Sequence, residues 1–207
     1  MIAGLKLDVG EEVYEPAEDS FLLARHAELL RGRILDMGCG CGIQALACAK
    51  ACAENLVVGV DINPRAVENS RANAEKNGAG NAEFLVSDLF SNVKGKFDAI
   101  VFNPPYLPTA RSERLEGNAN AAFDGGKDGR KVTDRFIREF PKYLKPGGKV
   151  LLVESSLAGI EKTLGKLRNA GFDAKVVDEE RFFFEKIVVI EAGAPAGGSR
   201  RKWRKQI

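Results

Sequence analysis

The chain lacks the features that mark membrane and secreted proteins. No stretch approaches the about 18 consecutive apolar residues that a transmembrane helix requires. The first residues, MIAGLKLDVGEE, do not show the basic region followed by an apolar region that forms a signal peptide. We therefore expect a cytoplasmic protein that makes no membrane contact.

Metal ligands are also scarce. His26 is the single histidine, and the four cysteines all lie within residues 39–52, with no second pair at zinc-finger spacing. A disulfide framework is not expected in a cytosolic chain of 207 residues. The sequence thus predicts no metal site, with two cysteines in a glycine loop and two on a helix.

Positive charge is scarce outside the C-terminal end. The formal net charge is +2, but SRRKWRKQI contributes five positive charges and no negative one, so the remainder carries 2 − 5 = −3. A net negative body is not typical of proteins that bind nucleic acid. We expect residues 1–194 to form a single domain. Residues 195–207 would then be a flexible basic tail, which either only adds solubility or contacts RNA, the ribosome or an acidic protein.

What the sequence does contain is a regular alternation of short apolar strands and amphipathic helices. This alternation predicts an open α/β sheet with helices on both faces. The last two strands follow each other without a helix, which favours a C-terminal hairpin that places one antiparallel strand in a mostly parallel, seven-stranded sheet. The expected strands are 33–38, 55–62, 82–90, 96–103, 146–155, 173–180 and 182–192, and the expected helices are 17–30, 42–52, 63–78, 132–144 and 157–171.

One long segment, residues 107–131, shows no pattern of its own. A loop of this length inside a compact domain is more often functional than idle. Because it follows the strand ending in FNPPY, we expect a lid or a loop that contacts substrate.

Polar residues follow each of the first four expected strands. In open α/β sheets, ligands bind at the carboxyl ends of the strands, near the point where the strand order reverses. The residues placed there are Asp36, Gly38 and Gly40 after the first strand, Asp61 and Ile62 after the second, Asp88 and Leu89 after the third, and Asn103, Pro104, Pro105 and Tyr106 after the fourth.

The glycine loop GCGCG after the first strand indicates a nucleotide-type ligand. A dinucleotide fingerprint needs a sixth-position glycine, but that position is Ile43, which excludes an NAD-dependent oxidoreductase. The acid at Asp36 would repel a pyrophosphate and suits the ammonium and sulfonium of S-adenosylmethionine. Asp61 stands where a carboxylate accepts from ribose hydroxyls, and Asp88 with Leu89 is suited to hold the adenine.

The segment FNPPY suits methylation of a planar nitrogen. Such a nitrogen is a poor nucleophile because its lone pair is delocalised. Acceptors for both of its N–H groups orient that lone pair, and the Asn103 side-chain oxygen and the Pro104 backbone carbonyl are two such acceptors. Pro104 and Pro105 stiffen the backbone, and Tyr106 can lie against the flat group. Catalysis is then positioning and desolvation, without a general base.

Other interpretations use the same residues. Methylation of adenine N6 or guanine N2 on a flipped base needs the same chemistry. Lysine methylation is less attractive, because the amine must first lose a proton and no base is evident near Asn103. A non-catalytic subunit would need neither the acids nor FNPPY.

Four motifs together resemble a known family. VYEPAEDS at 13–20, FNPPY at 102–106, GGKDGR at 125–130 and the following V-x-D-RF are similar to the archaeal and eukaryotic branch of the HemK/PrmC release-factor glutamine methyltransferases. These are class I, Rossmann-like enzymes that use S-adenosylmethionine. The likeness covers essentially residues 10–191.

The resemblance implies N5-methylation of the glutamine in the GGQ motif of a class I release factor. It implies a substrate-amide site at Asn103 to Tyr106 and a small zinc-binding activator protein as partner. The apolar run FFFEKIVVIEA either serves a partner in part or is simply a buried strand. The cofactor residues implied are Ser20, Asp36, Gly38, Gly40, Asp61, Ile62, Asp88, Leu89 and Asn103.

Overall fold

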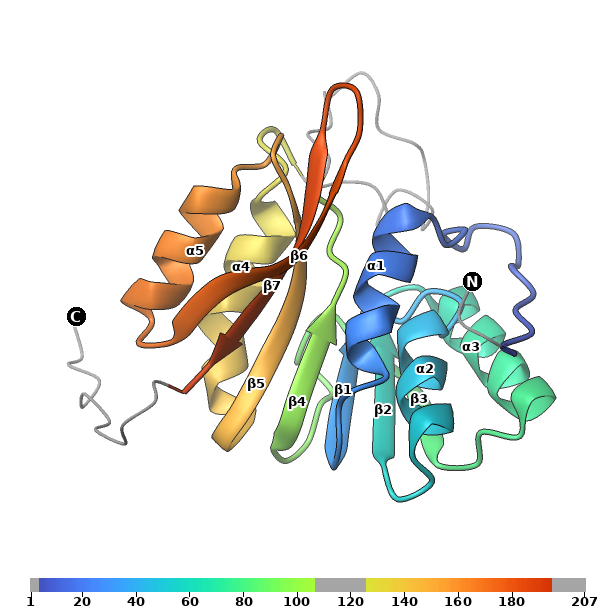
Figure 1. The fold of residues 1–207 in the computed structure, drawn as a ribbon. Helices are drawn as coiled ribbons and strands as arrows, with labels where there is room; N and C mark the ends of the chain where they lie inside the picture. Colours follow the sequence, from blue (N-terminus) through green and yellow to red (C-terminus); the bar gives the residue numbers. More distant parts are fainter. Residues whose placement is uncertain (1–3, 107–125, 195–207) are drawn as a thin grey trace.

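The computed structural model describes residues 4–106 and 126–194. Within these residues, seven strands form one sheet in the order β3-β2-β1-β4-β5-β7-β6 (Figure 1). The strands are β1 (Arg33–Met37), β2 (Leu56–Asp61), β3 (Ala82–Val86), β4 (Phe97–Phe102), β5 (Leu144–Ser155), β6 (Asp173–Arg181) and β7 (Lys186–Gly193). The helices are α1 (Glu18–Ala27), α2 (Ile43–Ala51), α3 (Pro64–Asn77), α4 (Lys131–Glu139) with a 3-10 turn at Phe140–Lys142, and α5 (Ile160–Asn169).

The pairing confirms the predicted fold class. The pairs among β3, β2, β1, β4 and β5 are all parallel, whereas β7 runs antiparallel between β5 and β6. From β1 the chain proceeds outward to β2 and β3, then returns to the other side of β1 to place β4. The strand order therefore reverses between β1 and β4, the place where open α/β sheets bind ligands.

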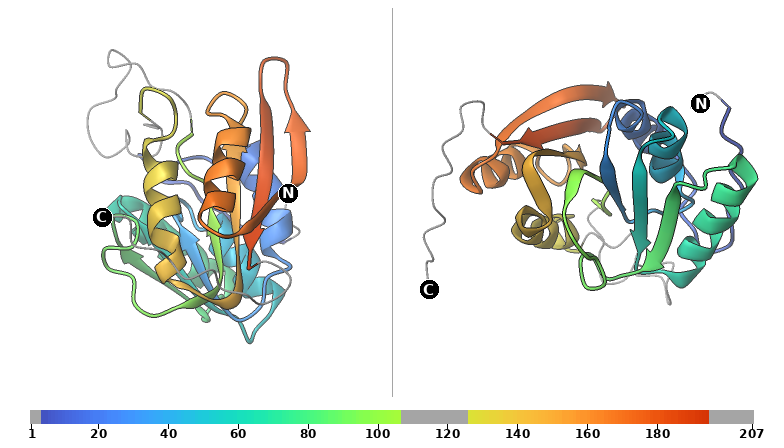
Figure 2. Two further views of the ribbon diagram at one scale, coloured as in Figure 1. Left: turned by 90° about the vertical axis from the view of Figure 1, so that its left-hand side faces the viewer. Right: turned by 90° about the horizontal axis from the view of Figure 1, so that it is seen from below.

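Helices cover both faces of the sheet (Figure 2). One core packs residues of α1, α2 and α3 against one face, and a second core packs α4 and α5 against the other. The inner strands are apolar on both sides for this reason; β4, for example, has Ile100 in one core and Val101 in the other.

Local signals explain why α3 begins and ends where predicted. The Asn63 side chain accepts a hydrogen bond from the Arg65 amide, and Pro64 occupies the first helical position. Gly78 then adopts a left-handed conformation with φ +62°, which ends the helix.

Two predicted strands differ from the observed ones. The third strand ends at Val86, so Asp88 and Leu89 lie in the loop that follows it. The apolar run at 182–192 is divided, because only the part from Lys186 onward is a strand. Phe182–Phe184 instead form the turn of the β6–β7 hairpin, where the side chains are exposed.

Some predictions fall outside the described residues. The expected loop at 107–131 is described only from Gly126, and the basic tail at 195–207 is not described. Within 4–106 and 126–194, no helix has the length and apolar character needed to cross a bilayer. The same residues contain no cluster of three histidine, cysteine, aspartate or glutamate side chains suited to a metal ion.

Candidate active site

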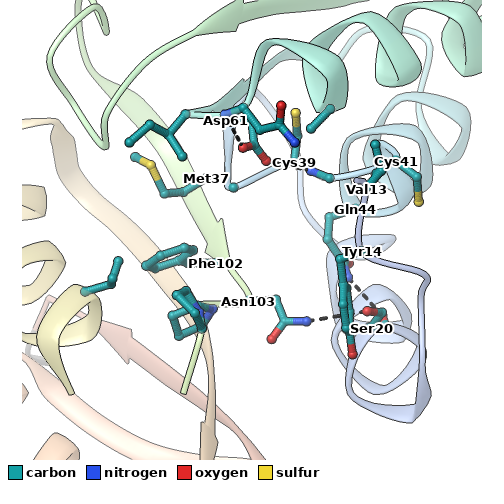
Figure 3. A pocket seen from close by; sticks show the side chains of 18 of the residues that line it. Val13, Tyr14, Ser20, Met37, Cys39, Cys41, Gln44, Asp61, Phe102 and Asn103 are labelled. Carbon is teal, nitrogen blue, oxygen red and sulfur yellow. Dashed lines mark hydrogen bonds between the residues drawn. The ribbon is translucent and has the colours of Figure 1, made fainter. Parts of the chain in front are cut away.

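A cavity of about 540 Å³ lies at the carboxyl ends of β1, β2 and β4, where the strand order reverses (Figure 3). It is lined from one side by α1 and the glycine loop, and from the other by the FNPPY segment and α4. Eleven of the twelve predicted site residues line it: Ser20, Gly38, Gly40, Asp61, Ile62, Asp88, Leu89, Asn103, Pro104, Pro105 and Tyr106.

The glycine loop connects β1 to α2 through three left-handed residues. Gly38, Gly40 and Gly42 have φ of +66°, +56° and +90°, which explains why glycine recurs at every second position. Asp61, at the end of β2, holds this loop by accepting from the Gly40 amide at 3.0 Å. Its other oxygen accepts from the Asn63 amide at 2.9 Å. Burial raises the pKa of Asp61 above its ordinary value.

Asp36 is the predicted site residue that does not line the cavity. Its side chain is buried beneath the glycine loop, where Oδ2 accepts from the Ala45 amide at 2.9 Å. Its Oδ1 is also buried and accepts no hydrogen bond from the part of the chain that the structure describes. Burial raises the pKa of Asp36 to about 8.

The loop after β3 departs from the expected arrangement in one respect. Both oxygens of Asp88 accept from Arg135 of α4, at 2.7 and 2.8 Å, and about half of the Asp88 side chain is exposed. An adenine amino group would have to share this carboxylate with Arg135. Leu89 is buried at the cavity wall with φ +46°, a conformation that is rare and costly for a non-glycine residue.

Asp19, in the first turn of α1, connects α1 to the FNPPY segment across the cavity and was not predicted from the sequence. Its buried carboxylate accepts from the hydroxyls of Tyr14, Ser20 and Tyr106 and from the Ser20 backbone amide. It also accepts from the Asn103 side-chain nitrogen at 2.9 Å. An acid at the start of a helix is usually a capping residue, so the sequence signal at Asp19 was ambiguous.

The contact with Asp19 fixes which way the Asn103 amide faces. The nitrogen donates to Asp19, so the oxygen turns away from α1, as Figure 3 shows. This oxygen is buried and receives no hydrogen bond from residues 4–106 or 126–194. The site therefore presents an unpaired acceptor at the position where the sequence predicted one.

Tyr106 is held in place rather than free to follow a ligand. Its hydroxyl donates to Asp19 at 2.9 Å, and its side chain is almost entirely buried. Burial, and then the negative charge of Asp19, raise the pKa of Tyr106 well above its ordinary value. Tyr106 is thus a neutral wall of the cavity.

Gly129 and Arg130 of the GGKDGR motif lie against the end of the FNPPY segment. Gly129 has φ +71°, and a Cβ atom there would lie 2.2 Å from the backbone oxygen of Tyr106. Arg130 is buried next to it and donates to the Ala158 carbonyl and the Thr163 hydroxyl. The motif therefore allows a close approach and ties it to α5, a role for which no catalytic contact is needed.

Gln44, at the start of α2, is a second lining residue that sequence reasoning missed. Its side-chain nitrogen donates to the Ser20 carbonyl at 2.9 Å, which leaves its oxygen buried and without a hydrogen bond from any described residue. Asn103 Oδ1 and Gln44 Oε1 are thus two buried acceptor oxygens of cavity-lining residues that receive no hydrogen bond from residues 4–106 or 126–194. Unpaired buried acceptors are costly, so the arrangement fits a ligand rich in N–H donors or positive charge.

Comparison with known proteins gives consistent results. The methyltransferase small domain family matches residues 17–116. A Methanocaldococcus jannaschii protein named for protein N5-glutamine methylation is 49% identical over 192 residues, which are 92% of this chain and 96% of that protein. A release factor glutamine methyltransferase of Geobacter sulfurreducens is 37% identical over 179 residues, 82% of this chain and 62% of that protein.

A solved structure extends the likeness. The Mtq2–Trm112 complex of E. cuniculi, responsible for methylation of the translation termination factor eRF1, contains a chain that matches with a TM-score of 0.70 at 26% identity. The match covers 89% of this chain and 99% of the solved one.

Proposed function

The chain belongs to the glutamine methyltransferase family of these relatives, and from this premise we propose that it methylates a release factor. The acceptor atom is N5 of the glutamine in the GGQ motif of a class I release factor, and the methyl donor is S-adenosylmethionine. The observation that carries this proposal is the Asn103 side-chain oxygen, which is buried in the cavity and receives no hydrogen bond from any residue that the structure describes.

The residues present fit the cofactor. Asp61 and Ile62 would hold the ribose, Leu89 would pack on the adenine, and Ser20 with the glycine loop would enclose the amino-acid end. The unpaired oxygen of Gln44 offers a further acceptor to that end. The bound sulfonium supplies an activated methyl group. Asp36, beneath the loop, would support that loop by accepting from the Ala45 amide rather than contact the cofactor directly.

The acceptor amide is oriented by the chain itself. The Asn103 oxygen accepts one N–H of the substrate amide, and the Pro104 backbone carbonyl accepts the other. Both acceptors lie at the end of β4, the strand beside the switch point. With both N–H groups held, the nitrogen lone pair points at the donor methyl, and exclusion of water by the cavity wall removes competing hydrogen bonds. Tyr106 is neutral and anchored, so it acts as a wall and not as a base.

Several further features belong to the same proposal. The Mtq2 relative forms a complex with Trm112, which supports a small zinc-binding activator protein as partner of this chain. None of the four cysteines forms a disulfide, which supports the cytoplasm as its compartment. A single catalytic domain over 1–194 and a contact of the basic tail with RNA or the ribosome stay predictions from the sequence.

A radiolabelled methyl-transfer assay tests the proposal. The acceptors are the organism's own release factor, the same factor with GGQ changed to GGA, and total RNA, each with and without the activator. Label on the wild-type factor and none on the GGA form is the expected result. Label on RNA alone would refute the glutamine assignment and favour nucleobase methylation.

An Asn103→Ala variant separates chemistry from binding. The substitution removes the unpaired acceptor, so we expect methyl transfer to fall by about 100-fold, the usual loss when one such electrostatic group is removed. Titration calorimetry with S-adenosylmethionine should still show binding, because Asp61 and the glycine loop are unchanged.

A further inference from the structure

The turn between β6 and β7 carries an exposed aromatic cluster, Phe182, Phe183 and Phe184, named here the aromatic tip. The Phe183 and Phe184 side chains are 92% and 85% exposed, and their rings meet edge to face with centroids 4.5 Å apart. Single exposed apolar residues are common, but adjacent phenylalanines exposed to this degree mark an interaction site.

The aromatic tip lies at the same end of the sheet as the cavity, the end at which the parallel strands finish. Ser155, at the carboxyl end of β5, pairs with Ile187, so the turn before Lys186 extends past that end. Figure 1 shows the hairpin projecting beyond the sheet on the side where α1 begins. The carboxylate of Glu185, next to the aromatic tip, adds to the effect of burial and Asp19 in raising the pKa of Tyr14 and Tyr106, so it is within electrostatic reach of the substrate site.

Three hydrogen bonds brace the hairpin turn. The Phe182 amide donates to the Glu185 carbonyl at 2.7 Å, and the Lys186 amide donates to the Ser156 hydroxyl at 3.0 Å. The Ser155 hydroxyl donates to the Glu185 carboxylate, which ties the turn to the end of β5. A preorganised turn loses little conformational entropy when a partner binds to it.

The two cations beside the aromatic tip, Arg181 and Lys186, are already paired. Glu179 of β6 accepts from Arg181 of the same strand at 2.8 Å and from Lys186 of β7 at 3.2 Å. These cations are therefore not available to a phosphate backbone without breaking their ion pairs. An apolar centre with paired polar groups around it is typical of a protein–protein contact.

We propose that the aromatic tip docks the acceptor protein, so that Phe183 and Phe184 insert into an apolar pocket on the release factor while its glutamine enters the cavity. The inference rests on the proposed function, because a protein that presents a glutamine to Asn103 must lie against the end of the sheet where the parallel strands finish. The cavity recognises the amide, and the aromatic tip recognises the protein that carries it.

The test is a double variant, Phe183→Ser with Phe184→Ser, assayed with the intact release factor and whatever activator the wild type requires. Because both side chains are exposed, the fold should persist. We expect KM for the factor to rise about tenfold or more, the effect of removing a central aromatic contact, with kcat at saturation unchanged. The affinity for S-adenosylmethionine should not change. Leu29→Ser is the matched control, because Leu29 is 72% exposed at the other end of α1.

Each other outcome overturns the proposal in an identifiable way. If the wild type does not label the factor, the proposed function fails and the docking inference fails with it. If the wild type labels the factor and the double variant shows the same KM, the inference alone fails. If KM is unchanged but the double variant loses binding to the activator, self-association or binding to anionic lipid vesicles, the aromatic tip is instead the site for the activator, a second copy or a lipid surface, respectively.

Discussion

The contact between Asp19 and Asn103 makes a sharp prediction for the variant Asp19→Asn. The substitution preserves shape and changes one carboxylate oxygen into an NH₂ group. The Ser20 backbone amide faces Oδ1 and cannot turn, so the new amide keeps its oxygen there and places its NH₂ where Oδ2 accepted from Asn103. Two donors then face each other, and the Asn103 amide relieves this by turning its oxygen toward residue 19.

The magnitude follows from the two orientations of Asn103. In the wild type, the hydrogen bond to the carboxylate favours the productive orientation by about 2 kcal/mol, so roughly 97% of molecules adopt it. In the variant, a neutral hydrogen bond of about 1 kcal/mol favours the reverse, which leaves roughly one molecule in six productive. We expect kcat for methyl transfer to fall about sixfold at saturating cofactor and acceptor.

Single-turnover methyl transfer measures this change, with cofactor binding followed separately by calorimetry. The control is Asp98→Asn, the same chemical change at a partly exposed carboxylate that pairs with Lys145 at the opposite end of β4. The control should retain its full rate. A kcat for Asp19→Asn within twofold of the wild type would refute the orienting role of Asp19.

Three further predictions concern stability and reactivity. In Gly129→Ala, the new Cβ would meet the Tyr106 carbonyl, so chemical denaturation should show that the free energy of unfolding falls by about 2–4 kcal/mol. The control Gly147→Ala has φ +77° and no heavy atom within 4 Å of its Cβ, so its free energy of unfolding should fall by only about 1–2 kcal/mol. Equal losses would contradict the packing role of Gly129. Because the pKa of Asp36 is raised from 3.8 to about 8, the folded protein holds a proton that the unfolded chain releases. The stability of the wild type relative to Asp36→Asn should therefore fall as the pH rises through this range and level off above it. Urea unfolding of both proteins at pH 5 and pH 8 tests the sign, and a stability difference that does not vary with pH would count against the prediction. Cys52 is partly exposed, while the other three cysteines are buried with raised pKa values, so iodoacetamide at pH 8 should label Cys52 first. Mass spectrometry identifies the labelled residue, and earlier labelling of the glycine-loop cysteines would disprove their burial.

Periodicity and local residue chemistry were enough to predict the elements of the fold. The cap at Asn63, the left-handed ending at Gly78 and the apolar runs of β1, β2 and β4 each act over a few residues, so their effects can be inferred from the chain alone. The same alternation restricts the strand order to a few arrangements, and the structure shows which of them is adopted.

The sequence also predicted eleven of the residues that line the cavity, because strand ends in an open α/β sheet converge. It placed Asp61 and Asn103 at the carboxyl ends of their strands, on one end of the sheet, and in the structure both line the cavity. It did not predict that Asp36 would lie beneath the loop. Whether an acid next to a glycine loop faces the ligand or the core depends on the path of that loop, which its three left-handed glycines decide.

The sequence by itself determined the fold class and the family, and it predicted the Asn103 side-chain oxygen as a hydrogen-bond acceptor for a planar nitrogen, since each of these depends on residue type and spacing. Only the tertiary structure decided the orientation of that acceptor. Asn103 and Asp19 are separated by 84 positions, and an amide has two orientations that no local pattern distinguishes. The same holds for the aromatic tip. In the sequence, three phenylalanines before an apolar strand are typical of the core, but in the structure the pairing of β7 with β5 begins only after them, which leaves them exposed. Contacts between residues distant in the chain, which set hydrogen-bond direction and exposure, are what folding adds to the information in the sequence.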